Sequence, residues 1–153
     1  MLTGYSECID SFFAFGLFEI AKRSGFFPEE LVDTFEPVIH EEGRHILFFI
    51  NWAAWHRRNL NIFKRCWFEL NVVAVWAFIF AQRISIAAGV GKGTRYTNFT
   101  FTGANQMGQP VTARSLIDLC LSENERRMAQ YDSRLVRPRF VPALARLLRR
   151  LIK

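Results

Sequence analysis

The sequence has little of what stabilises small secreted proteins. Its 153 residues include three cysteines, Cys8, Cys66 and Cys120, which are odd in number, widely spaced and outside any CxxC pair. This pattern does not suit a disulfide framework or a CxxC motif, and it predicts reduced, buried thiols. The first residues, MLTGYSEC, lack the basic segment that opens a signal peptide and already carry an acid at Glu7. We therefore expect a cytoplasmic protein.

The sequence also lacks the strict alternation of polar and apolar residues that marks half-buried strands. Its sixteen Phe and four Trp residues recur instead at helical intervals. We therefore predict an all-α fold, a packed helical bundle. Cap, proline and glycine signals place its helices at about 3–23, 29–58, 62–88 and 112–135, followed by a short basic helix after Pro138 and Pro142.

Details of the chain refine this prediction. Thr112 is the expected cap of the fourth helix, and Pro37 is expected to kink the second helix or to split off its first turns. Residues 89–110, rich in Gly, Thr and Asn, are expected to form a long irregular connection. We divide the chain into a helical domain at 1–135 and a basic amphipathic tail helix at 136–153.

No uninterrupted apolar run reaches the length of a membrane span. The longest candidate, LNVVAVWAFIFAQRISIAAGVG at 70–91, is broken by Arg83 after about twelve residues, whereas a spanning helix needs about 20. This length favours burial of the segment in a bundle over a transmembrane helix.

The stretch HEEGRH at 40–45 raises the question of a metal site. His40 and His45 are five residues apart, so a helix turns them roughly 140° away from each other, and they cannot share a metal as HExxH histidines do. Glu42 and His45 are three apart and lie on one face. This Glu-x-x-His unit is the one that helical bundles use to hold iron or manganese.

The predicted hairpin supplies further ligands. If the first two helices turn at about residues 26 and 27, Glu7 and Asp10 lie opposite Glu42 and His45. Carboxylates buried among aromatic residues need a metal or polar partners. The four side chains are therefore either ligands of iron or manganese, or a hydrogen-bonded or ion-paired cluster that can include Arg44. By contrast, Glu36 and His40 are predicted to be surface residues.

The stretch from Glu7 through EEGRHILFFINW resembles the ferritin-like superfamily of carboxylate-bridged metal proteins, in particular its bacterial ferritin-like domain members. The resemblance covers about residues 3–58. It implies a ferritin-like bundle in which Glu7 is the lone glutamate, Glu42 the bridging glutamate and His45 the imidazole ligand. It also implies oxidoreductase chemistry at a dinuclear site that a second pair of helices completes.

The sequence departs from the pattern of this superfamily. A second Glu-x-x-His is missing, because the residue three positions after Glu123 is Arg126 and not a histidine. The helix at 62–88 also offers no ligand, because it is apolar at the level of the site. The site can therefore be mononuclear or dinuclear. Another interpretation is that the N-terminal hairpin of the bundle is missing, or that another subunit of a homo-oligomer supplies it.

The C-terminal tail carries most of the positive charge. Residues 133–153 contain seven basic residues and no acid. The charge of this segment, +7, exceeds the net charge of +6 for the whole chain. Leu144 and Leu148 lie on one face of the tail helix, and Arg146 and Arg150 lie on another. Such a helix can lie on an anionic membrane, dock on an acidic partner, or close the bundle or a dimer. Nucleic acid is not an expected partner, because no recognised nucleic-acid-binding motif surrounds the basic residues.

The residues leave two functions open, and they do not decide whether the protein is an enzyme. The first is a protein that binds iron or manganese through Glu7, Glu42 and His45, with Asp10 as an extra ligand, and that carries out redox chemistry. The second is a non-enzymatic helical interaction module. In that case the polar cluster holds no metal, and the basic tail binds a membrane surface or a protein partner.

Overall fold

The computed structural model describes residues 1–25, 27–90 and 112–152, with the backbone alone for 86–90. The described residues form helices and no strand, which confirms the predicted all-α class. Of the long connection predicted at 89–110, residues 91–110 lie outside the described part. The helices are α1 (Leu2–Ser24), α2 (Glu29–Arg58), α3 (Ile62–Val90), α5 (Ala113–Met128) and α6 (Phe140–Leu151).

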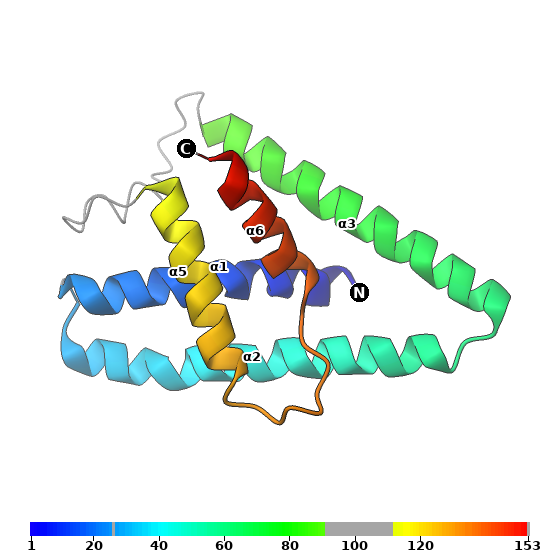
Figure 1. Cartoon of the computed structure of the whole chain (residues 1–153), viewed down its shortest axis with the longest axis horizontal. Helices are drawn as coiled ribbons and strands as arrows, with labels where there is room; N and C mark the ends of the chain where they lie inside the picture. Colours follow the sequence, from blue (N-terminus) through cyan, green and yellow to red (C-terminus); the bar gives the residue numbers. More distant parts are fainter. Residues whose placement is uncertain (26, 91–111, 153) are drawn as a thin grey trace.

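Helix α1 is the element around which the others are arranged. It runs antiparallel to α2, α3 turns back obliquely from the far end of α2, and α5 and α6 cross α1 at a steep angle (Figure 1). Helix α1 packs against α2, α3, α5 and α6. It ends at Gly25, whose φ of 62° is the left-handed conformation that favours glycine. Helix α2 remains one helix through Pro37.

The fourth predicted helix has the expected start and an earlier end. The Thr112 hydroxyl accepts a hydrogen bond from the Ser115 amide at 3.1 Å, which confirms the predicted cap. The helix ends at Met128 and does not reach Leu135. In the next turn Asp132 accepts a hydrogen bond from the Arg134 amide at 2.9 Å, a local bond that competes with the helical pattern.

The core joins the tail helix to the rest of the bundle. Phe12, Phe15, Ile46 and Leu116 are almost fully buried in it, and Val141 and Ala145 of α6 belong to the same cluster. Helix α6 packs on α5 and α1, so its apolar face helps to close the bundle, one of the roles predicted for the tail. Membrane contact through the tail stays a prediction. None of the described helices is both long and apolar enough to span a membrane.

Glycine allows α1 to approach its neighbours closely. A Cβ at Gly16 would lie 2.4 Å from the Cys120 sulfur and 3.1 Å from its backbone, and one at Gly4 would lie 2.4 Å from the Phe49 ring. All of these distances are shorter than ordinary contacts of a Cβ atom. Helix α1 therefore approaches the backbone of α5 at position 16, and at position 4 it leaves room for the Phe49 ring of α2.

Gly16→Ala should lower the free energy of unfolding by about 1–3 kcal/mol, because the added methyl group overpacks the crossing of α1 and α5. In an exposed helix the same change raises stability by up to about 1 kcal/mol, so the two cases differ in sign. Denaturant unfolding measures this change. The loss should be smaller in a Cys120→Ala background, which removes the nearest atom. A Gly16→Ala protein as stable as the wild type would contradict the close approach.

Candidate functional site

The predicted metal ligands lie on neighbouring antiparallel helices, as the hairpin register requires. Glu7 and Asp10 belong to α1, and Glu42 and His45 belong to α2. Glu7 and Glu42 are half-buried, whereas His45 and Asp10 are exposed to solvent. The structure therefore places only the two glutamates in surroundings where an unpaired charge is costly.

Asp10 is paired with a guanidinium group that no sequence pattern connects to it. Arg83 Nη2 of α3 lies 2.6 Å from each carboxylate oxygen of Asp10. The Ser6 hydroxyl donates to Asp10 at 3.0 Å and accepts from Arg83 at 3.0 Å. This contact ties α3 to α1, and a metal at Asp10 would have to displace Arg83.

The other three predicted ligands have no such partner. Glu7, Glu42 and His45 form no hydrogen bond or ion pair with a described residue, and Arg44 pairs with Glu41 at 2.9 Å. In the described part of the chain, which includes all four predicted ligands, no group of three or more His, Cys, Asp and Glu side chains is placed to hold a metal ion. The metal site stays a prediction.

The three cysteines differ in their surroundings. Cys8 and Cys120 are buried, and burial raises the pKa of each thiol to about 12. Cys66 is exposed on α3, so the prediction of three buried thiols is wrong at this position. Periodicity places Cys66 in a strongly apolar helix, but it cannot show which face of that helix is covered.

A buried ion cluster joins α5 to α2 across α1. Arg127 and Glu123 are each 4% exposed. The Arg127 guanidinium donates to Glu36 at 2.9 Å and lies 3.5 Å from Glu123. It also lies over the ring of Phe15, with 5.5 Å between its central carbon and the ring centroid. Burial of these charges without mutual pairing would be unfavourable, so the cluster fixes how the three helices meet.

The long-range contact of this cluster is not visible in the sequence. Glu36 is predicted at the surface, yet it receives a hydrogen bond from a buried arginine 91 residues away. The spacing of Glu123 and Arg127, four residues apart on α5, is the signal that could have indicated an ion pair.

Tyr131 fastens the segment after α5 to α2. Its hydroxyl donates to the His40 carbonyl oxygen at 2.7 Å, and the two rings stack with centroids 5.1 Å apart. Burial raises the pKa of Tyr131, so the hydroxyl keeps the proton that it donates. A Cβ at Gly43 would lie 2.5 Å from the tyrosine oxygen. His40, also predicted at the surface, is thus a half-buried anchor.

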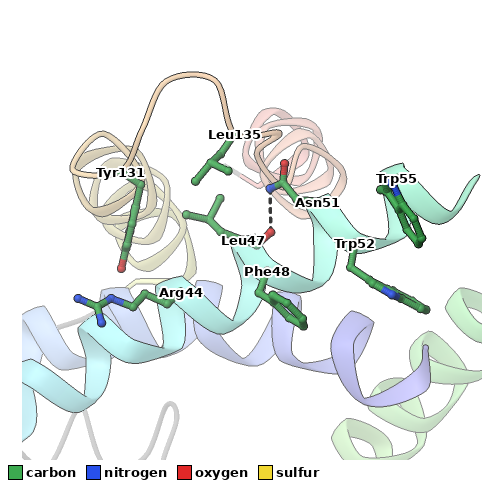
Figure 2. Close-up of a pocket in the computed structure, with 8 residues that line it drawn as sticks. All are labelled: Arg44, Leu47, Phe48, Asn51, Trp52, Trp55, Tyr131 and Leu135. Atoms are coloured by element: carbon green, nitrogen blue, oxygen red, sulfur yellow. Dashed lines mark hydrogen bonds between the residues drawn. The ribbon is translucent and has the colours of Figure 1, made fainter. Parts of the chain in front are cut away.

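An apolar groove lies between this fastened segment and α2. Figure 2 shows Tyr131 and Leu135 extending toward α2 from the segment after α5. Asn51 holds the two walls together, because its amide donates to the Val136 carbonyl at 3.0 Å and accepts from the Val136 amide at 2.9 Å. The groove has a volume of about 450 Å³, and its lining residues are Arg44, Leu47, Phe48, Asn51, Trp52, Trp55, Tyr131 and Leu135.

The aromatic side chains at the groove remain largely accessible. Phe48 is 74% exposed and Trp55 is 61% exposed. Their spacing with Trp52, four and then three residues, sets all of them along one side of α2. Helical periodicity predicts such aromatic residues in the core, and here they lie outside it. The groove can accept apolar side chains of another helix, whereas the described residues around it offer few charged groups.

Comparison with known proteins adds no assignment. No protein-family model matches the sequence, and neither the curated proteins nor the solved structures give a significant match. The resemblance of residues 3–58 to the ferritin-like superfamily therefore stays a prediction.

Arg127→Ala should lower the free energy of unfolding by about 3–5 kcal/mol, because it removes the buried cation that Glu123 and Glu36 share. Arg126→Ala is the matched control: Arg126 also binds Glu123, at 2.6 Å, but its side chain is half exposed. That change should cost about 0–1 kcal/mol. Equal losses in the two variants would contradict the buried cluster.

Proposed function

We propose that this chain is a non-enzymatic helical interaction module that assembles with further copies of itself through exposed apolar surfaces on α2 and α3. One observation carries the proposal: several large apolar side chains on these helices leave more than half of their surface exposed to solvent. Phe48 and Trp55 on α2 are joined on α3 by Phe63, 83% exposed, and Trp67, 69% exposed.

The magnitude of this exposure supports the proposal. Burying a large apolar side chain is worth about 1.5–3 kcal/mol, and soluble monomers rarely expose a contiguous apolar patch larger than a few hundred Å². Four aromatic side chains that each leave more than half of roughly 150–250 Å² exposed add up to a comparable area, divided between α2 and α3. Covering them with another protein surface would yield a large favourable free energy.

The groove on α2 supplies a shape for such contacts. Its apolar floor and its single cationic end at Arg44 suit a helix that inserts aliphatic or aromatic side chains, a common mode of helix recognition. Since Asn51 and Tyr131 hold both walls, the groove is formed before any partner binds.

Sedimentation equilibrium of the full chain tests this proposal. We expect a mass above the 17.8 kDa of one chain at high concentration, falling toward it on dilution, with little change in roughly 0.5 M salt because apolar contacts are not screened. Phe48→Gln should weaken association, whereas Thr34→Gln, at another exposed position of α2, should not. A mass of one chain at every concentration would refute self-assembly.

Metal binding is a second candidate, and the observation that favours it is the pair of half-buried carboxylates, Glu7 and Glu42, which form no ion pair with the described residues. A metal ion would compensate their charge. Within one chain, no three of the described His, Cys, Asp and Glu side chains are close enough together to hold a metal ion. Side chains of a further subunit would therefore have to complete the site.

Reconstitution with Fe(II) or Mn(II) without air, followed by elemental analysis, tests this candidate. The wild type should retain the metal, and His45→Ala and Glu7→Gln should lose most of it with helix content intact. His56→Ala is the control. His56 is also on α2, but it lies eleven residues from His45 and stacks on Trp52, so its loss should not affect the metal. Absence of metal from the wild-type protein would rule the candidate out.

A further inference from the structure

Helix α3 is apolar on two faces, and only one of them packs on the bundle. On the packed face, Phe68 and Ile79 are buried, and Val72 and Val75 are half-buried. Trp76 contacts Tyr5 of α1 with ring centroids 5.1 Å apart. A helix that is apolar all round is normally covered all round. The described residues cover α3 on one face only, and the helix runs obliquely away from α2 (Figure 1).

The uncovered face carries a regular heptad pattern. Its residues follow one another at alternating intervals of four and three, which is the spacing of the contact line of a coiled coil, over three heptads. We call this line the α3 seam, and every residue in it is exposed: Phe63, Trp67, Leu70, Ala74, Ala77, Ala81 and Ile84.

We propose that the α3 seam packs against the α3 seam of a second copy of this chain, with the two helices antiparallel. This proposal rests on the proposed self-assembly and names its contact surface. In an antiparallel pair, the seam of one copy faces the seam of the other across a two-fold axis that is perpendicular to both helices. That axis passes between Ala74 and Ala77, so that Leu70 of one copy faces Ala81 of the other.

The distribution of side-chain volume along the seam favours this orientation. The first half carries Phe63, Trp67 and Leu70, and the second half carries three alanines before Ile84. A parallel pair would set bulk against bulk at one end and methyl groups against methyl groups at the other, which leaves a gap. In the antiparallel pair both ends of the contact hold the same side chains, because Trp67 faces Ile84 and Leu70 faces Ala81 at each end. The remaining alanines meet at the axis, where they let the two backbones approach closely.

Charge favours the same orientation. Lys64 and Arg65 lie in the first turn of α3, where the helix dipole is already positive. A parallel pair would bring these four cations to one end. In an antiparallel pair they lie near the C-terminal half of the partner helix, whose dipole is negative there. A chain with a net charge of +6 gains most from this separation.

The exposed area is also close to what a stable dimer needs. The face that holds the seam leaves on the order of 700 Å² of apolar side-chain surface in water, given roughly 150–250 Å² for an aromatic side chain. A standard interface takes about 800 Å² from each partner. The large side chains that contribute are 55% to 83% exposed and comprise Phe63, Trp67, Leu70, Val73, Phe78 and Ile84.

The first test compares two variants with the same change of charge. Leu70→Glu would bury a carboxylate in the seam, and the dimer dissociation constant should rise roughly 100-fold or more. Gln82→Glu, exposed on α3 but off the seam, should leave it within about threefold, since exposed charges interact weakly. Leu70 is 63% exposed in the single chain, so Leu70→Glu should keep the wild-type circular dichroism spectrum.

The second test determines the orientation by cysteine cross-linking in a Cys66→Ser background, in which the remaining Cys8 and Cys120 are buried. Leu70→Cys and Ala81→Cys are purified separately and oxidised alone or mixed. In the antiparallel pair, only the mixture should form the disulfide-linked dimer, because identical positions lie about 16 Å apart along the axis. In a parallel pair, each variant would cross-link to itself.

The outcomes separate this proposal from the proposed function. A wild-type protein that sediments as a single chain overturns both. A wild-type dimer that Leu70→Glu does not weaken overturns the seam and leaves self-assembly in place. Self-linking of each cysteine variant overturns the antiparallel orientation. Loss of the dimer in Leu70→Glu, together with cross-linking only in the mixture, supports the proposal.

Discussion

The missing side chain at position 16 is the constraint on which the rest of the structure depends. Helix α1 can lie against α5 only because nothing stands between Gly16 and Cys120. Since α1 also packs on α2, α3 and α6, the position of each of these helices follows from that crossing. The same close approach brings Arg127 of α5 over Phe15 and within reach of Glu36 of α2.

Polar contacts then fix the helices in the positions that the close approach of α1 and α5 allows. The buried Arg127 joins three helices, and the Tyr131 hydroxyl ties the segment after α5 to α2. Asn51 completes this attachment with two hydrogen bonds to Val136. As a result the bundle is fixed on the side of α5, while the aromatic side chains of α2 and the seam of α3 stay in water. Rigid walls and uncovered apolar faces together suit a protein that works by association.

The helices could be predicted from the sequence because their limits are set locally. Pro28 and Asn59 bound α2, and Thr112 caps α5 as expected. The predicted end of α5 is too late, because Asp132 forms a local turn with the Arg134 amide and the Tyr131 hydroxyl bonds to α2. The second of these contacts is long-range, and no local pattern reveals it. The pairing of Asp10 with Arg83 is hidden for the same reason. Periodicity identifies apolar residues such as Phe48 and Trp67, but whether another helix covers a given face depends on the whole fold.

Amide hydrogen exchange at two protein concentrations tests most directly whether association covers α3. Association stabilises the elements at the interface by mass action, and exchange reports the stability of each element separately. We expect amides of residues 62–85 to slow most in the concentrated sample, while those of α1 and α5 slow less, because only global unfolding links them to the interface. Exchange in α3 that does not depend on concentration would contradict association through this helix.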